Sequence, residues 1–416
     1  MSTHILLTKD RAAGPQTFAE FRAEGGLLAL ETALAAAPEA VLAALESSGL
    51  RGRGGAGFPA AVKWRLAASQ PGPDKYVLAN GGEHEPGSDK DKHLVEHYPH
   101  KVLEGMVLCG FATGASRGYL YLIEDMAAPL AAAEHAIIEL RDAGWLGADI
   151  GGRGFAFDIE IHRAPTTYVA GEETAALESV EGRPAKPRAK PPYPGESGLF
   201  GKPTTVNNVE TFAHVPYLLR HGAAHYRSIG TADCPGTMLF TLGQQVLRPG
   251  VYELPFGSTF RQLLDGCGGG LRSGGEVRAI LPALSCAWLG AEHLDAVMDR
   301  ATLRDLGSSL GCGGVTFIES GDDVVARALD IAQFFMDEQC GLCPPCRMQT
   351  NQAVHVLRGV AAGKGPGYAE KLEKLTAFAR GKGRCSLIEM AAAPLMSALR
   401  LFEADFARAA GGDAAP

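Results

Sequence analysis

Several features that mark membrane proteins and nucleic-acid-binding proteins are missing from this sequence. No apolar run in its 416 residues approaches the roughly 20 that a membrane-spanning helix needs. Lys and Arg number 39 against 47 Asp and Glu, giving a net charge of -8, and the basic residues are scattered rather than blocked. We therefore expect no nucleic-acid partner and no direct membrane insertion, so that any membrane attachment would come through partner proteins.

Targeting signals and hydrolase sites are also missing. Residues 1–10 show neither a basic stretch followed by an apolar one nor the Arg-rich, acid-free composition of a transit peptide. No Ser/His/Asp or metal-hydrolase constellation is visible.

Of the nine cysteines, five are solitary and are expected to be small buried hydrophobes: Cys109, Cys234, Cys267, Cys286 and Cys312. The other four cluster late, which favours a reducing compartment, the cytoplasm, and one metal site.

Strand-like and helix-like runs alternate in the first half of the chain. A helical stretch at 26–50, broken at Pro38, precedes short β-type runs at 76–80, 119–123 and 157–162, which are separated by helix-length stretches at 99–114 and 128–143. This alternation predicts a mostly parallel α/β sheet. From about 236 the pattern changes to short strands with Gly/Pro turns and a helix at 259–264, which predicts a small α+β module closing at 314–318. Residues 322–409 predict a helical bundle.

The late cysteines form a compact ligand pattern. Cys340, Cys343 and Cys346 lie three residues apart in a turn stiffened by two prolines, and Cys385 follows after a helix-length spacer. Three thiolates from one turn and a fourth from a distant element suit a 4Fe-4S cubane, in which each iron needs one thiolate. A structural zinc site would more often show two separated C-x2-C pairs, so zinc and disulfides remain as weaker alternatives.

Two glycine-rich segments resemble nucleotide-binding loops. Gly52, Gly54 and Gly57 match the pattern G-x-G-x-x-G, but the segment follows a helical stretch at 41–50 where a Rossmann fingerprint needs a strand. Its glycines still let backbone N–H groups approach a phosphate or a flavin, with Lys63 as a countercharge; a plain flexible turn is an equally good interpretation of this segment alone. The segment 195–202 resembles a P-loop, but its spacing is one residue too long and Pro203 replaces the magnesium-binding Ser or Thr, so we reject an NTPase.

Three polar segments could contact a ligand. Residues 168–173 contain Glu172 and Glu173 at the start of a helix, where carboxylates either complement the helix dipole or bind ribose hydroxyls, a flavin or a nicotinamide. Residues 80–86 lie just past a strand's carboxyl end, where α/β sheets bind ligands. Asn207 and Asn208 offer amides to a polar ligand, although such a pair is also common in turns.

Taken together, these segments resemble the NADH-binding flavoprotein subunit of respiratory complex I, a unit that recurs in NAD-linked formate dehydrogenases and hydrogenases. The matching segments run in family order over almost the whole chain: 48–59 with Lys63 and Trp64, 85–87, 168–174, 181–183, 201–204 with 207–211, and the four cysteines. No single segment is specific, but their combination is.

The resemblance implies a fold, cofactors and partners. It implies a Rossmann-like FMN domain at 1–235, a ubiquitin-like β-grasp domain at 236–320 and a helical bundle at 321–416 that carries a 4Fe-4S cluster on Cys340, Cys343, Cys346 and Cys385. The partners it implies are a thioredoxin-like 2Fe-2S subunit and a larger iron-sulfur subunit. NADH would be the substrate.

The resemblance also assigns site residues by position. Those implied to line FMN are Gly54, Gly55, Lys63, Asn80, Gly171, Glu172, Glu173, Asn207 and Asn208. Those implied to face NADH are Phe58, Glu85, Glu173, Lys190 and Tyr193, with the ring of Phe58 or Tyr193 stacking on it. The cofactor-binding set further includes Arg53, Ala56, Gly57, Glu83 and Tyr168.

Three departures from the family pattern are present. Where the family has Asn-Ala-Asp-Glu, this chain has residues 80–83, with Gly82 in place of the aspartate. Where the family has Lys-Asp-Arg, this chain has residues 90–92, with Lys92 in place of the arginine. The family's glycine-serine turns in the β-grasp domain are replaced by other residues at 284–286 and 311–312. These changes favour a specialised paralogue over a housekeeping complex I subunit.

NADH yields two electrons as a hydride while an iron-sulfur cluster takes one, which requires a flavin between them. The rival hypothesis is a scaffold that kept the fold and cluster but lost NADH use.

Overall fold

The computed structural model describes residues 4–9 and 14–411, so part of the amino-terminal segment considered above for a targeting signal lies outside it. A four-stranded parallel sheet organises the first half of the chain, in the order β3-β2-β1-β4. Its strands are β1 (Tyr76–Gly81), β2 (Arg117–Ile123), β3 (Asp158–Ala164) and β4 (Thr204–Asn208). The first three confirm the expected strands, whereas β4 was missed because its short Thr-Thr-Val run stands between a proline and a helix.

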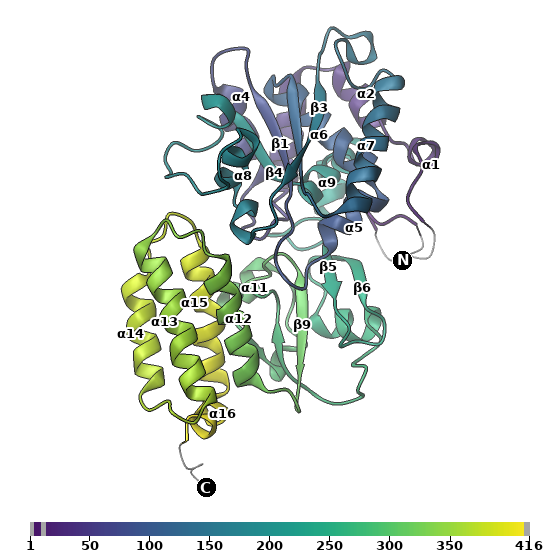
Figure 1. The fold of residues 1–416 in the computed structure, drawn as a ribbon. Helices are drawn as coiled ribbons and strands as arrows, with labels where there is room; N and C mark the ends of the chain where they lie inside the picture. Colours follow the sequence, from purple (N-terminus) through teal and green to yellow (C-terminus); the bar gives the residue numbers. More distant parts are fainter. Residues whose placement is uncertain (1–3, 10–13, 412–416) are drawn as a thin grey trace.

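Helices cover the two faces of this sheet unequally (Figure 1). The face toward Val77 and Leu120 packs against a thick helical layer, and the face toward Leu78 and Tyr121 packs against α8 (Glu173–Val180) and the turn η3 (Leu199–Gly201). The thick layer and its flanks contain α1 (Phe18–Ala23), α2 (Leu28–Leu34), α3 (Pro38–Ser48), α4 (Ala60–Ser69), α5 (Lys90–His97), α6 (Pro99–Thr113), α7 (Ala127–Asp142), α9 (Val209–His221) and α10 (Ala223–Arg227).

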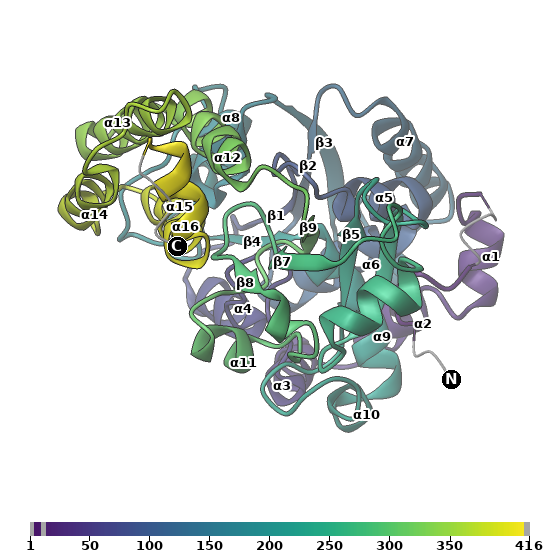
Figure 2. The ribbon, with the colours of Figure 1, turned by 90° about the horizontal axis from the view of Figure 1, so that it is seen from below.

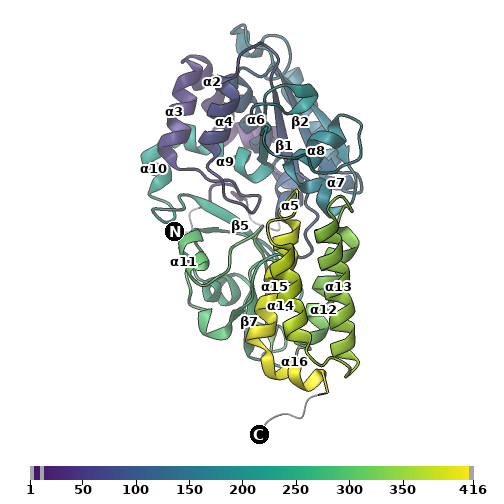
Figure 3. The same cartoon turned by 90° about the vertical axis from the view of Figure 1, so that its left-hand side faces the viewer.

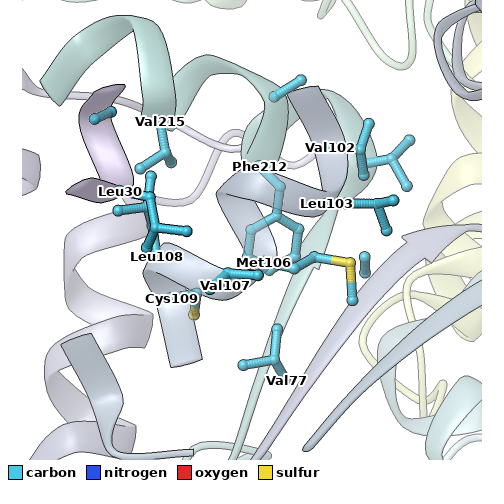
Figure 4. Close-up of a cluster of buried hydrophobic side chains, with 14 of the residues drawn as sticks. Leu30, Val77, Val102, Leu103, Met106, Val107, Leu108, Cys109, Phe212 and Val215 are labelled. Atoms are coloured by element: carbon cyan, nitrogen blue, oxygen red, sulfur yellow. The ribbon is translucent and has the colours of Figure 1, made fainter. Parts of the chain in front are cut away.

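Helix α6 forms the centre of the thick layer. Nearly all its residues are buried, the polar His100, Lys101 and Glu104 included, because neighbouring elements cover the helix on all sides. Figure 4 shows its side chains Met106 and Val107 beside the ring of Phe212 from α9, with Val77 of β1 below them. Gly105 permits this packing, since a Cβ there would lie 2.0 Å from the carbonyl oxygen of Phe212.

A mixed five-stranded sheet follows, in the order β6-β5-β9-β7-β8. Its strands are β5 (Thr237–Leu242), β6 (Gly250–Pro255), β7 (Val277–Leu281), β8 (Leu289–Gly290) and β9 (Gly314–Glu319), with α11 (Arg300–Asp305) beside them (Figure 2). The helix expected at 259–264 continues as a π-helical turn over Gln262–Cys267. This part of the chain has its own apolar core, which contains Phe240, Phe260 and Phe317.

The carboxyl-terminal part is the expected helical bundle, whose long helices run side by side below the parallel sheet (Figures 1 and 3). It contains α12 (Val324–Glu338), α13 (Pro344–Ala361), α14 (Tyr368–Ala379), α15 (Leu387–Leu401) and α16 (Glu403–Ala409). The cysteine turn separates α12 from α13. In the described part of the chain, none of these or the other helices is long and apolar enough to cross a membrane.

Candidate functional site

The glycine loop connects two helices, α3 and α4, which agrees with the rejection of a Rossmann fingerprint. Gly55 and Gly57 have φ values of +110° and +63°, a region that favours glycine. A Cβ at Gly54 would lie 3.1 Å from Cβ of Asn208, so the loop approaches the carboxyl end of β4 closely. Because the carboxyl ends of parallel strands form the usual ligand edge of an α/β sheet, the loop is placed to close one side of a site there.

Three asparagines at this edge hold the site's backbone together. The Asn80 side-chain amide donates to the carbonyl of Gly171 at 2.8 Å and accepts from the Gly82 amide at 3.0 Å. Asn208 caps α9, accepting from the Glu210 amide at 3.0 Å, and donates to the Asn80 carbonyl at 3.1 Å. Asn207 accepts from the Trp64 indole at 3.0 Å. Their amides therefore join β1, β4, α4 and the turn before α8 into one frame.

Alternating charges line the start of α8. The Glu173 carboxylate accepts from Lys63 at 2.7 Å and from Lys190 at 2.9 Å, and Lys190 also reaches Glu172 at 2.9 Å. Although burial opposes ionisation, the two ammonium groups lower the pKa of Glu173; burial likewise opposes the charge of Lys190, but the two carboxylates raise its pKa. Both groups are thus charged at neutral pH, and hydrogen-bonding groups on a nucleotide would meet a fixed polar surface.

Glu85 connects the parallel-sheet region to the mixed sheet. Its carboxylate accepts from the Ser285 amide at 3.1 Å and hydroxyl at 3.0 Å and from the Tyr168 hydroxyl at 3.1 Å. Burial raises its pKa, and these hydrogen bonds only partly oppose that shift. The Tyr168 ring packs edge-on against Phe334 of α12, with centroids 5.1 Å apart. The pair therefore lies where the three parts of the chain meet.

The four thiols of the cysteine pattern line one cavity. Cys340, Cys343, Cys346 and Cys385 surround it, and Val169 and Leu387 contribute apolar wall. The amide of Arg384 donates to the Cys343 sulfur at 3.3 Å. Burial and the three neighbouring thiols raise the pKa of Cys346 to about 12. The donor set fits a metal cluster held by four thiolates.

The alternatives for these cysteines find no support in the geometry. All nine cysteines are free, which excludes the disulfides. Within residues 4–9 and 14–411, no group of three or more His, Cys, Asp or Glu side chains is placed to hold a single metal ion, as a zinc site would require.

Comparison with known proteins assigns both regions. A family model described as the Nuo51 FMN-binding domain matches residues 45–217, and one described as the NADH-ubiquinone oxidoreductase-F iron-sulfur binding region matches residues 326–409. The second F-type subunit of NADH-quinone oxidoreductase in Rhizobium meliloti is 41% identical over 405 residues, covering 97% of this chain and 96% of that protein. The chain belongs to the family of NADH-quinone oxidoreductase F-type subunits. The resemblance stated from sequence is confirmed.

Two further relatives agree. The F-type subunit of NADH-quinone oxidoreductase in Aquifex aeolicus is 40% identical over 362 residues, covering 87% of this chain and 83% of that protein. The solved structure of an NAD+-reducing [NiFe]-hydrogenase in the H2-reduced state matches with a TM-score of 0.84 and 30% identity, over 98% of this chain and 67% of the hydrogenase chain. The match supports a parallel α/β fold with a helical carboxyl-terminal region. The chain thus carries the family's FMN-binding domain around the glycine loop and its iron-sulfur region around the four cysteines.

Arg53 and Glu83 of the expected cofactor set, like the three asparagines of the frame, are held by hydrogen bonds within the protein. Arg53 is fully buried and donates to the carbonyls of Thr237, Arg51 and Pro235. Glu83 caps α5, accepting from the amides of Asp91 and Lys92 at 3.0 Å each. By contrast, the two rings expected to stack on NADH are free to do so, since Phe58 and Tyr193 are 49% and 52% exposed.

Two further residues stand at the site, His84 within the expected segment 80–86 and Arg300, which the sequence did not indicate. His84 follows Glu83, and its Nε2 is buried without a partner among the described residues; burial lowers its pKa to about 4, so the ring is neutral at pH 7. Arg300 lies 245 positions from Gly55 of the glycine loop and contacts it directly. No local pattern marks Arg300, because it acquires its surroundings only from the fold.

The solitary cysteines mostly follow expectation. Cys109, Cys234 and Cys286 are buried, whereas Cys267 and Cys312 are only half-buried. Cys312 and Cys286 lie close enough to Tyr168 to influence its pKa, and Cys312 also influences that of Glu85, so these two thiols belong to the surroundings of the site.

Proposed function

We propose that this chain oxidises NADH at bound FMN and delivers single electrons through a 4Fe-4S cluster to an iron-sulfur partner subunit. Bound FMN supplies the conversion between two-electron hydride chemistry and one-electron transfer. The residues proposed to hold it are those of the glycine loop, the asparagine frame and the Glu172–Glu173 pair. Phe58 or Tyr193 would cover the nicotinamide, so that hydride donor and acceptor lie about 3 to 3.5 Å apart.

One observation carries this proposal: the cavity of the four thiols is also lined by Val169 and Pro187, which belong to the FMN-binding region. Val169 lies in the same turn as Gly171, whose carbonyl is held by Asn80. Glu172 is near enough to influence the pKa of Cys385. A flavin on the asparagine frame and a cluster on the thiols would therefore be neighbours, as direct electron transfer requires.

The assembly and the domain division are proposed on the same basis. We assign 1–235 to the FMN and NADH domain, 236–320 to a β-grasp domain and 321–416 to the cluster-bearing bundle; the five-stranded mixed sheet supports the second and the match of residues 326–409 the third. The proposed partners are a thioredoxin-like 2Fe-2S subunit and a larger iron-sulfur subunit, since the relatives are named as subunits of larger oxidoreductases. The free cysteines and the metal site favour the cytoplasm.

An anaerobic titration tests the function. NADH added to the full-length protein loaded with FMN and cluster should bleach the flavin absorbance band, and NAD+, which carries no hydride, should not. A spectrum that NADH leaves unchanged would favour the non-catalytic scaffold.

A further inference from the structure

Several carbonyl groups of the glycine loop have hydrogen-bond partners, whereas the amide groups of residues 54–57 have none among the described residues. Three guanidinium groups hold its carbonyls: Arg53 donates to Arg51 at 2.7 Å, Arg51 to Gly57 at 3.4 Å, and Arg300 to Gly55 at 3.1 Å and Gly52 at 3.3 Å. The backbone amides of residues 54–57, in contrast, donate no hydrogen bond to any described residue. Successive free amides on a loop with positive-φ glycines form a concave site for an anion.

Arg300, unlike Arg51 and Arg53, lies far from the glycine loop in the sequence. It is the first residue of α11, whose start is fixed by Asp299 capping the Thr302 amide at 2.7 Å. Its guanidinium lies against Gly57 so closely that a Cβ there would be 1.8 Å from its Cζ. Gly57 is therefore required for two reasons, its φ of +63° and the space it leaves for Arg300.

Two of the three positive charges that hold the loop have no carboxylate partner among the described residues. Arg51 pairs with Asp233 at 3.0 Å, but neither Arg53 nor Arg300 has a carboxylate within ion-pair distance in the described part of the chain. The Nε of Arg300 is buried and without a hydrogen-bond partner there. Burial of this unpaired charge lowers the pKa of Arg300; Arg53 and Arg51 add to that effect, and Cys234 and Asp233 oppose it. An anion on the loop would relieve the repulsion.

We propose that Arg300 is a positioning residue, which holds the glycine loop in the conformation that binds a nucleotide phosphate and whose unpaired charge strengthens that binding. The inference rests on the proposed function, because the phosphate belongs either to FMN or to the dinucleotide. Arg300 acts from behind the loop and touches neither ligand. It also makes phosphate binding depend on the docking of α11 against the parallel-sheet region.

Paired probes with and without phosphate test this on the full-length chain. Dissociation constants are measured for FMN against riboflavin with flavin-free protein, and for ADP against adenosine, in wild type, Arg300→Gln and Arg300→Lys. Arg304→Gln is the control, because Arg304 lies on the same helix, is exposed, and pairs with Asp305. Arg300→Gln should weaken at least one phosphate-bearing probe roughly tenfold, the scale of one charge interaction in a partly buried site, and leave its phosphate-free counterpart unchanged.

The outcomes separate the sources and the hypotheses. A loss for FMN alone assigns the phosphate to the flavin, and a loss for ADP alone assigns it to the dinucleotide. Equal losses for riboflavin or adenosine would show a general collapse of the loop, and unchanged constants would show no role; either overturns the proposal. If Arg300→Gln does not fold, Arg300→Lys decides. Lysine keeps the charge but lacks the planar fork whose two nitrogens reach the Gly55 and Gly52 carbonyls separately, so it should weaken the phosphate-bearing probe alone by severalfold. If wild type and the variants bind FMN and ADP equally well, this inference is wrong but the proposed function is not. If wild type binds neither FMN nor ADP, the proposed function is wrong too.

Discussion

At the scale of single residues, the structure gives adjacent carboxylates different tasks. Glu172 caps α8 by accepting from the amides of Thr174 at 2.8 Å and Ala175 at 3.0 Å. The Glu173 carboxylate instead bridges Lys63 and Lys190. The capping account of this pair therefore applies to the first glutamate, and the second remains available for a ligand.

Glu173→Gln should consequently affect cofactor use more than folding. The change removes the charge that orders two lysines but leaves the cap in place, so we expect a stability loss of about 1 kcal/mol or less together with much slower NADH-dependent reduction of an acceptor. Thermal unfolding and steady-state kinetics measure the two effects. Glu172→Gln is the matched variant and should lose more stability. Unchanged kinetics with a clear fall in melting temperature for Glu173→Gln would make its role structural.

Gly82 is a second residue whose role depends on its neighbours. Its φ is not positive, but a Cβ there would lie 3.1 Å from Oδ1 of Asn80 and 3.1 Å from the ring of Tyr121. Glu83 cannot supply the missing carboxylate because it caps α5. The loop beside the proposed flavin site is therefore less negative than the family pattern implies.

Restoring the carboxylate with Gly82→Asp should lower the two-electron potential of bound FMN, because a negative charge disfavours the anionic reduced form. Gly82→Ala is the control, since it adds the same Cβ without charge; we expect both variants to lose about 1 to 3 kcal/mol of stability through the tight contact. The potential is measured by anaerobic titration against a redox dye. A potential in the Asp variant equal to or above that of the Ala variant, with FMN bound, would refute the electrostatic argument.

At the scale of elements, two prolines fix the cysteine turn. Pro344 and Pro345 occupy the first two positions of α13, where they need no amide partner, so that Cys343 precedes the helix and Cys346 lies in its first turn. Cys385 stands two residues before α15, which brings the fourth thiol to the same cavity. The ends of three helices thus depend on one site.

Cys385→Ala should abolish the broad iron-sulfur absorbance and destabilise the bundle, because three thiolates leave one iron without a ligand. Iron analysis and EPR of the reduced protein measure the loss. Cys109→Ala, in the core around α6, is the control and should keep its iron. A Cys385 variant with a full iron content and an unchanged EPR signal would show that another residue is the ligand.

Helix α6 carries a carboxylate in its buried surface. Burial raises the pKa of Glu104 to about 7, although the amides of Leu27 and Leu30 oppose this shift. The folded protein therefore holds a proton that the unfolded chain, with a value near 4.5, releases as the pH rises. The free energy of unfolding therefore declines as the pH rises from about 4.5 to about 7, and Glu104 causes no further change above pH 7.

Glu104→Gln should remove this decline. The variant should match wild type near pH 4.5 and exceed it above pH 7 by an amount on the order of 1 to 3 kcal/mol. Urea unfolding at a series of pH values measures the difference. Stability curves of the two proteins that stay parallel across the whole interval would assign the decline to other groups.

At the scale of the whole molecule, single carboxylates connect distant parts of the chain. Glu210 of α9 pairs with buried Lys90 at 2.8 Å and accepts from the Leu239 amide of β5 at 2.8 Å, which ties the two sheets together. Glu253 of β6 accepts from the amides of Ile5, Leu6 and Leu7 at 2.8 to 3.1 Å. The start of the described chain is thereby held on the mixed sheet.

Glu253→Ala should release that amino-terminal segment. Three amides would lose their charged acceptor, at a cost of about 1 to 3 kcal/mol, and residues 5–7 should exchange amide hydrogens faster and be cut sooner by a protease. Hydrogen exchange with mass spectrometry locates the effect, and Glu276→Ala, on the exposed surface, is the control. Equal exchange in both variants would mean that apolar burial of Ile5 to Leu7 alone holds the segment.

The sequence by itself determined the parts whose physics is local. The cysteine spacing indicated the cluster ligands, and the strand and helix alternation indicated the parallel sheet and the bundle. The glycines with Glu172 and Glu173 predicted a nucleotide site only together with the family resemblance. Strand β4 escaped, because three β-forming residues carry too little periodicity. The tertiary structure alone decided which polar groups are free to act: it buried Arg53, used Glu83 as a cap and brought Arg300 to the glycine loop across 245 positions. Such contacts depend on how whole modules pack, and a side chain hydrogen-bonded within the protein has the same sequence signal as one that is available to a ligand.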